Sequence, residues 1–391
     1  MKPAERLSNV TEYYFSRKLR EVARMNAEGK DIISLAIGSP DMPPSEATIA
    51  TLCEVARRHD THGYQPTAGT PELRRAMARY YERTYGIALN PDGEVLPLIG
   101  SKEGILHVTL AFVNPGETVL VPNPGYPTYT SLSKLLGANV ETYDLLDNGQ
   151  PDFEELRSRD LSQVRLMWTN YPHMPTGAPA RRETYDRLVE LARSNDFVIA
   201  NDNPYSRILA NKEHPSLSIL SSPRAKECCV EMNSLSKSHN MPGWRVGMCV
   251  GNEQFISWIL KVKSNIDSGT FRGIQLAAAA ALENADEWHH EYNYEVYARR
   301  RRLAEQIMRT LGCTYNEEQV GMFLWGRIPE HYHDAEELTE RLLHEARVFI
   351  TPGFIFGENG RRNIRISLCA NEEKLQTALK RIEGIARAIE H

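Results

Sequence analysis

A lysine in a loop of small residues is the side chain of this sequence best placed to do chemistry. Lys237 lies in the run Ser234-Leu-Ser-Lys237-Ser-His-Asn-Met-Pro-Gly-Trp-Arg245, directly after the apolar segment Cys228 to Met232. A lysine held in a tight loop at the end of a strand loses water, and its pKa falls toward neutrality because desolvation disfavours the ammonium. The resulting free amine attacks carbonyl groups. The alternative interpretation is an ordinary solvated loop lysine.

The residues around Lys237 suit an aldehyde cofactor that carries a phosphate. The amine would form a Schiff base with the aldehyde, the Ser234 hydroxyl would hold the phosphate, and Arg245 would add positive charge. Pyridoxal 5'-phosphate (PLP) has both groups. The run therefore predicts a PLP site with Lys237 as the covalent anchor.

The run resembles the PLP-lysine segment of class I/II aminotransferases, which are fold-type I PLP enzymes. In that family a serine, two spacers, the lysine and a GWRVG-like arginine segment recur. Further matches occur in the family's order along nearly the whole chain. They are Gly38-Ser-Pro-Asp41, Tyr64 in GYQPTAGTPELR, Ser101-Lys102-Glu103, Tyr126 in PNPGYPTY, Pro175-Thr176-Gly177, Asp202-Asn-Pro-Tyr205 and Asn363-Ile-Arg365-Ile-Ser367. The resemblance implies that the protein moves an amino group from an amino acid to a 2-oxo acid through a Lys237 Schiff base.

The resemblance also implies which residues contact the cofactor. Asp202 would pair with the pyridinium nitrogen and keep it protonated, so that the ring withdraws electrons from the substrate α-carbon. Tyr205 would bond the ring 3'-oxygen, and Tyr126 would stack on the ring. Ser101 and Lys102 stand between an apolar strand and a helix, where backbone N–H groups can hold a phosphate.

A second set of residues is expected to bind the substrate. Arg365, on a short strand, would clamp the α-carboxylate with its planar guanidinium, and Gly38 would let the backbone approach that carboxylate closely. Asn170 is a further candidate. Tyr64 would reach the cofactor phosphate from a partner subunit, so the resemblance implies a homodimer with shared active sites.

One position departs from the family's pattern. Where the family reads Asn-Pro-Thr-Gly, this chain has Met174-Pro-Thr-Gly177, and a methionine cannot donate a hydrogen bond to the ring oxygen. Either Asn170, His173 or a water replaces the missing donor, or the ring oxygen relies on Tyr205 alone. The second case would raise the pKa of the Schiff base, because one stabiliser of its neutral form is lost.

Two alternative functions remain open at this stage. A C–S β-lyase of the same fold uses the same carbanion but expels a thiol, and the motifs do not separate it from an aminotransferase. A non-catalytic PLP-binding protein is the other alternative, and the intact lysine chemistry argues against it. For the donor's side chain, Arg272 is the candidate partner of a distal carboxylate, although a surface arginine before a helix is the better interpretation. Donors with neutral or apolar side chains are therefore favoured, with glutamate and 2-oxoglutarate still open as the exchange pair.

The elements that position these residues follow an alternating pattern. Short apolar runs alternate with helix-period segments from about residue 72 to residue 250, which predicts an α/β, mainly parallel sheet with helices on both faces. From about residue 287 the pattern changes to an α+β arrangement that begins with a long helix. With the resemblance, this implies a seven-stranded-type large PLP-binding domain over 41–286, a small C-terminal domain over 287–391, and an N-terminal arm over 1–40 that packs with the small domain.

Composition limits the partners and the location. The 391 residues carry a net charge of −5 with acids and bases interspersed, so neither nucleic acid nor an anionic membrane is an expected partner. No apolar stretch approaches the roughly 20 residues of a membrane span, and the N-terminal residues lack a signal-peptide pattern, which favours the cytoplasm.

The six cysteines show no CxxC spacing, so we expect reduced core residues. No metal site is expected, because His289 and His290 are helix neighbours that point apart.

Overall fold

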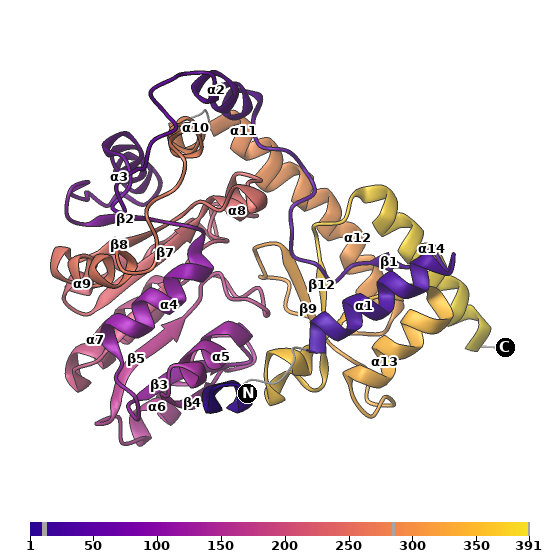
Figure 1. The fold of residues 1–391 in the computed structure, drawn as a ribbon. Coiled ribbons are helices and arrows are strands. Elements are labelled where there is room, and N and C mark those ends of the chain that lie inside the picture. The colour runs from indigo at the N-terminus through magenta and orange to yellow at the C-terminus, as the bar shows by residue number, and fades with distance from the viewer. Residues whose placement is uncertain (10–13, 284–285, 390–391) are drawn as a thin grey trace.

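The chain forms two lobes in the computed structural model, which describes residues 1–9, 14–283 and 286–389 (Figure 1). One lobe holds a seven-stranded sheet, and the other holds two small sheets. The strands of the large sheet, in spatial order, are β2 (Val95–Leu98), β8 (Gly247–Gly251), β7 (Cys229–Ser234), β6 (Val198–Asp202), β5 (Val164–Thr169), β3 (Thr118–Asn123) and β4 (Asn139–Asp144).

The large sheet is mostly parallel, which confirms the predicted α/β fold. The pairs of β3 with β4 and β5, of β5 with β6, and of β6 with β7 are all parallel. Strand β8 runs antiparallel to both of its neighbours. Because the parallel strands point the same way, their carboxyl ends meet at one edge of the sheet, where open α/β sheets place their ligand crevice.

Helices cover both faces of this sheet, because successive strand residues point to opposite sides. In β5, Leu166 and Trp168 pack into one buried apolar cluster, while Met167 packs into the other. Helices α3, α6, α7 and α10 contribute to the cluster of Met167, and α4, α5 and α9 contribute to the other. The helices of this lobe are α2 (Glu46–Ala56), α3 (Pro71–Tyr85), α4 (Ser101–Phe112), α5 (Pro127–Leu135), α6 (Phe153–Ser158), α7 (Arg182–Asn195), α8 (Leu235–Ser238), α9 (Glu253–Lys263) and α10 (Arg272–Glu283).

The second lobe joins the two ends of the chain. Its small sheets pair β1 with β10 in parallel and β11 with β12 and β9 in antiparallel order. The N-terminal helix α1 packs beside α13 and α14 in Figure 1, and its Val22 and Met25 share a buried cluster with Phe349. The elements are α1 (Tyr14–Ala27), β1 (Ile33–Ser34), α11 (Asp286–His290), a π-helix (Glu291–Val296), α12 (Tyr297–Thr310), β9 (Phe323–Arg327), α13 (Ala335–Arg341), a π-helix (Leu342–Ala346), β10 (Val348–Phe349), β11 (Thr351–Pro352), β12 (Asn363–Ser367) and α14 (Glu372–Ile389).

The structure corrects one expectation about the cysteines. All six are free thiols and five are buried, but Cys53 on α2 is exposed, so the prediction of a core position was wrong there. Helix α2 packs against α10, and the side chain of Cys53 on this helix remains exposed to solvent. In the described ranges no helix has the length and apolar content to span a membrane.

Candidate active site

A cavity of about 340 Å³ lies at the carboxyl ends of the parallel strands. Eleven of the twelve predicted site residues line it, and they come from strands, helix starts and loops of the large-sheet lobe, from the linker after β1 and from strand β12. These residues are Gly38, Ser101, Lys102, Tyr126, Asn170, Asp202, Tyr205, Ser234, Lys237, Arg245 and Arg365. The twelfth, Tyr64, is 96% exposed and lies outside this cavity.

Lys237 stands on the short helix α8, which begins directly after β7. The hydroxyl of Ser234 caps this helix by accepting a hydrogen bond from the Ser236 N–H, at 3.2 Å. The Lys237 amine donates to the Gly38 carbonyl. Burial lowers the pKa of Lys237, and the positive charges of Arg365 and Arg245 lower it further. The site thus favours a free amine at Lys237 more than water does.

Asp202 is the last residue of β6 and is buried beneath the cavity. Its Oδ2 accepts a hydrogen bond from the Tyr129 hydroxyl at 2.9 Å, whereas its Oδ1 has no hydrogen-bond partner among the described residues. Burial raises the pKa of Asp202 to about 7, and the hydrogen bond from Tyr129 opposes that rise. A buried carboxylate oxygen without a partner calls for a cationic N–H donor. A protonated pyridine nitrogen is such a donor.

The opposite end of the cavity is shaped for an anion. Gly100 has a φ of 76° and precedes the N-terminus of α4, and a Cβ at that position would collide with the Arg245 guanidinium. Arg245 also approaches the Ser236 hydroxyl, with 3.4 Å between Nη1 and Oγ. A phosphate can bind here through three kinds of group. They are the Arg245 guanidinium, two serine hydroxyls and the free backbone N–H groups at the start of α4.

A buried charge cluster supports the turn that begins α4. Oε2 of Glu103 accepts a hydrogen bond from the Ile99 N–H at 2.5 Å, and Oε1 lies 2.7 Å from Nε2 of His107. The ammonium of the buried Lys263 pairs with Asp267 and lies 3.7 Å from Glu103. Burial alone would raise the pKa of Glu103, but these partners outweigh it and lower the pKa to about 2. The cluster therefore keeps a carboxylate ionised two residues after Ser101.

Arg365 lies at the substrate end of the cavity on the central strand of a three-stranded sheet. It is only 6% exposed, and its Nη2 donates to the Ala36 carbonyl at 2.8 Å. Its guanidinium carbon is 4.0 Å from the centre of the Phe323 ring and 4.6 Å from that of Phe356. A desolvated guanidinium held between aromatic faces is a strong partner for a carboxylate.

The Met174 departure has a defined geometry. Its backbone N–H donates to Oδ1 of Asn170 at 2.7 Å, and Nδ2 of Asn170 donates to the Asp202 carbonyl at 2.5 Å. Asn170 thereby ties the Met174 turn to the end of β6. His173 bonds Thr176, with 2.8 Å between Nδ1 and Oγ1, and does not line the cavity. Of the two proposed replacement donors, only Asn170 reaches the cavity.

Several cavity residues escaped the sequence analysis. Tyr129 bonds Asp202 and stacks on Trp168 at 4.8 Å between ring centres, and its edge faces the ring of Tyr126. Ser236 lines the cavity beside Arg245, and Phe323 lines it beside Arg365. Ser236 and Tyr129 stand two and three residues after predicted site residues, which is a usable signal. Phe323 had none, because only the fold brings it beneath Arg365.

Arg272 does not serve as a distal cation within this subunit. Its Nη2 pairs with Oε1 of Glu72 at 3.1 Å, and it does not line the cavity.

Comparison with known proteins identifies the family. The model of the family described as aminotransferase class I and II matches residues 30–382. The chain belongs to the class I and II aminotransferase family. It is 39% identical to the LL-diaminopimelate aminotransferase of Dehalococcoides mccartyi over 99% of this chain and 100% of that protein.

Two solved aminotransferase-fold structures resemble this one along their whole length. The substrate-bound BacF structure from Bacillus subtilis superposes with a TM-score of 0.91 at 32% identity, and covers 99% of this chain and 98% of its own. The aromatic aminotransferase from Pyrococcus horikoshii OT3 superposes with a TM-score of 0.89 at 27% identity and covers 99% of both chains.

Membership of the family settles the reaction class. The protein is a PLP-dependent aminotransferase that moves an amino group from an amino acid to a 2-oxo acid, and the C–S lyase alternative is not favoured. The cavity fits PLP at both ends, because Asp202 Oδ1 has no hydrogen-bond partner within the described ranges where the ring nitrogen would lie, and Gly100 lets the Arg245 guanidinium lie against the start of α4 where the phosphate would lie.

Proposed function

We propose that this aminotransferase takes LL-diaminopimelate as its amino donor. The observation that carries the proposal is the similarity to the Dehalococcoides mccartyi LL-diaminopimelate aminotransferase, which extends over essentially the whole of both chains at 39% identity. The cavity is compatible with that donor.

The charge of the donor's side chain supports this choice. The distal end of diaminopimelate carries one ammonium and one carboxylate, so its net charge is zero, whereas the distal end of glutamate or aspartate carries a net charge of −1 that calls for a dedicated cation. Arg272, the candidate for that arginine, is already paired with Glu72. A donor with a neutral side chain is also what the sequence favours.

The proposed division of labour follows the cavity. Arg365 binds the α-carboxylate, and Gly38 allows the backbone to approach it. Asp202 and Tyr205 hold the ring of PLP, which supplies an electron sink for the substrate α-carbon. The Lys237 amine takes the proton from Cα, a task that suits an amine whose pKa is lowered by burial.

The remaining cofactor contacts are assigned by position. Ser101, Ser234 and Arg245 bind the phosphate, with Lys102 at the start of the same helix. Tyr126 stacks on the ring. Asn170 belongs to the substrate side of the cavity, and its amide bonds to the backbone of Asp202 and of Met174 orient those two residues.

We also propose a homodimer with shared active sites. Tyr64 is 96% exposed and does not line the cavity of its own subunit, which suits a side chain that reaches the phosphate of a partner. The domain division 1–40, 41–286 and 287–391 is part of the same proposal, and the pairing of β1 with β10 supports it. The cytoplasm is the proposed location, because none of the six cysteines forms a disulfide.

The donor is tested by single-turnover reaction of the PLP-loaded enzyme without an acceptor, followed by absorbance at the cofactor. The panel is LL-diaminopimelate, its meso isomer as the matched control, phenylalanine and glutamate. We expect LL-diaminopimelate to react at least about tenfold faster than each of the others, and Arg272→Ala to leave its rate unchanged. Faster reaction of glutamate, together with a loss of more than about tenfold in Arg272→Ala, would overturn the proposal.

An aromatic donor is the second candidate. Phe15, Phe323, Ile355 and Phe356 line the cavity, and the similarity to the Pyrococcus horikoshii aromatic aminotransferase extends over the whole chain. In the same panel this candidate predicts that phenylalanine reacts fastest.

A further inference from the structure

The segment 36–43 crosses from the small sheets to the loop that carries Lys237, and its backbone contacts the site at three successive carbonyls. The Ala36 carbonyl accepts from Arg365 at 2.8 Å, and the Gly38 carbonyl accepts from Lys237. Between them, the Ile37 carbonyl accepts from the Ser367 hydroxyl at 2.8 Å. The position of this segment therefore bears on both the carboxylate clamp and the catalytic amine.

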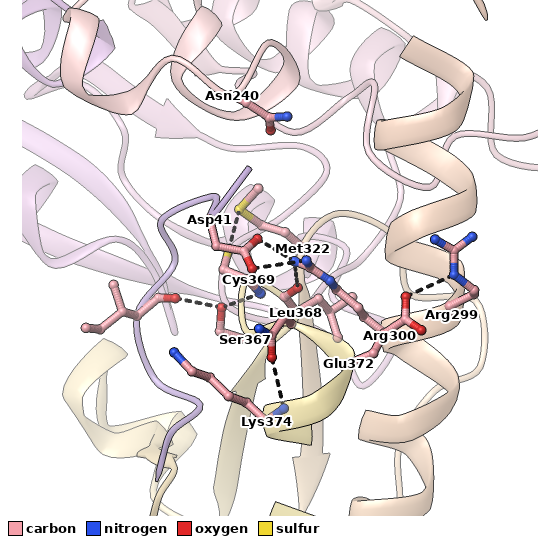
Figure 2. Close-up of polar contacts among 12 residues, drawn as sticks. Asp41, Asn240, Arg299, Arg300, Met322, Ser367, Leu368, Cys369, Glu372 and Lys374 are labelled. Atoms are coloured by element: carbon pink, nitrogen blue, oxygen red, sulfur yellow. Dashed lines mark hydrogen bonds and ion pairs between the residues drawn. The ribbon is translucent and has the colours of Figure 1, made fainter. Parts of the chain in front are cut away.

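An ion pair between a buried arginine and a partly exposed aspartate fixes the far end of the segment. Nη1 of Arg300 lies 2.7 Å from Oδ1 of Asp41, and Nη2 lies 3.1 Å from Oδ2, so the guanidinium grips the carboxylate with two parallel bonds (Figure 2). Nη1 also donates to the Leu368 carbonyl at 3.1 Å. Arg300 is 4% exposed and belongs to α12 of the second lobe. A fork of this kind sets a distance and an orientation, which a single point charge cannot do.

The other side of the segment touches the lysine loop. Nδ2 of Asn240, three residues after Lys237, donates to the Pro43 carbonyl at 3.3 Å. Asn240 has a φ of 54°, a left-handed backbone conformation that is uncommon outside glycine. In Figure 2 Asn240 faces the segment from the side opposite Arg300. The segment is thus held between α12 and the loop of the catalytic lysine.

We propose that the Arg300–Asp41 ion pair is a positioning element of the active site, which holds the segment 36–43 where Lys237 and Arg365 can engage the substrate. Neither residue lines the cavity, so the pair acts through the backbone of the segment. Its loss shifts the Ala36 and Gly38 carbonyls, and with them the two side chains that those carbonyls hold. The reaction itself is unchanged.

The chain offers a matched control on the same helix. Arg299, the neighbour of Arg300, pairs with Oε1 of Glu372 at 2.9 Å on the surface (Figure 2). Arg299→Gln removes an arginine and an ion pair from the same turn of α12 without touching the segment. Asp41→Asn keeps the shape of the carboxylate at a site that is one-third exposed, and Arg300→Lys keeps the charge but loses the fork.

Two measurements separate positioning from simple stabilisation. The first is the KM and kcat of the holoenzyme with the amino donor found by the panel above, and this arm alone rests on the proposed function. The second uses the cofactor-free protein and follows the pH dependence of Lys237 modification by trinitrobenzenesulfonate, with the site identified by peptide mapping. This second arm does not depend on which donor is correct.

We expect Asp41→Asn and Arg300→Lys to raise KM by about five- to tenfold with a smaller effect on kcat. The reason is that the shifted segment weakens the binding of the substrate carboxylate by Arg365 more than it slows the reaction of the bound substrate. In the same variants the pH of half-maximal Lys237 modification should fall by about half a unit, since the ammonium loses the Gly38 acceptor. Arg299→Gln should leave both quantities at wild-type values. If Asp41→Asn and Arg300→Lys lower only the melting temperature while KM and the modification midpoint stay unchanged, the pair is merely structural and the proposal is wrong.

Discussion

The guanidinium of Arg365 touches the sulfur of Met174, with 3.3 Å between Nη1 and Sδ. A thioether is at best a weak acceptor and donates nothing, so the residue beside the clamp gives no hydrogen bond to the cofactor or the substrate. The amide of Asn170 is already committed on its oxygen to the Met174 N–H and on its nitrogen to Asp202. On the proposed arrangement, the ring oxygen of PLP would depend on Tyr205 more than the family's pattern implies.

Replacing Met174 by asparagine should restore the missing donor. A donor to the ring oxygen stabilises the neutral form of the lysine–cofactor linkage, so we expect the spectral titration midpoint of the holoenzyme to fall by about one pH unit in Met174→Asn. Met174→Leu, which keeps the apolar volume, is the control and should titrate like the wild type. Equal midpoints in the asparagine and leucine variants would show that position 174 does not reach the ring oxygen.

Gly38 is packed too closely to Phe323 to carry a side chain. A Cβ at position 38 would lie 2.5 Å from the ring of Phe323, which in turn lies 4.0 Å beneath the Arg365 guanidinium. Gly38→Ala should displace that ring and raise the KM of every amino donor by about tenfold. The double variant Gly38→Ala/Phe323→Leu, which makes room for the methyl group, should recover part of the loss. A double variant no better than Gly38→Ala would contradict the steric explanation.

The raised pKa of Asp202 predicts how the stability of the cofactor-free protein depends on pH. Its folded value is about 7 and its ordinary value is 3.8, so between these the folded state binds the extra proton. The contribution of Asp202 to the free energy of unfolding is fully present below about pH 4. It falls by about 1.4 kcal/mol per pH unit as the pH rises toward 7. Asp202→Asn should remove this slope. Urea unfolding of the cofactor-free wild type and of Asp202→Asn from pH 4 to 8 measures this slope. If the free energy of unfolding changes with pH by the same amount in both proteins, the slope does not come from Asp202.

Glu103 predicts the opposite trend. Its folded pKa of about 2 lies below its ordinary value of 4.5, so its contribution is present above about pH 4.5 and is lost as the pH falls toward 2. Glu103→Gln should lower the free energy of unfolding by about 1 to 3 kcal/mol at pH 7, because the buried Lys263 keeps less compensating charge. The difference from wild type should shrink on acidification to pH 3.5. Glu154→Gln, at an exposed position, is the control, and a deficit independent of pH would count against this account.

Local sequence pattern was enough to predict much of this molecule. The lysine run and the family resemblance selected Lys237, Asp202 and Arg365, which lie around one cavity, and the alternation of apolar and helix-period segments predicted the mainly parallel sheet. Helices α2 and α10 were missed, because α10 is a run of alanines and glycine with little polar contrast, and α2 packs on it rather than on the sheet.

The contacts that the pattern could not give are those between distant segments. Phe323 beneath Arg365 and Arg300 beside Asp41 join residues 42 and 259 positions apart, and no local spacing signals either contact. Sequence reasoning also placed the exposed Cys53 in the core. The missing CxxC spacing indicated reduced thiols, but it carries no information on which side of a helix faces solvent.

The most direct test of the account is a single turnover of the PLP-loaded enzyme with an amino donor and no acceptor, compared with the Lys237→Ala variant. Oxo acid and pyridoxamine phosphate should form in amounts equal to the enzyme sites in the wild type, and the variant should form them at least about a thousandfold more slowly, because the amine that moves the Cα proton is gone. An unchanged rate in Lys237→Ala, or continuous release of pyruvate and ammonia from cystathionine without pyridoxamine phosphate, would contradict amino transfer through Lys237.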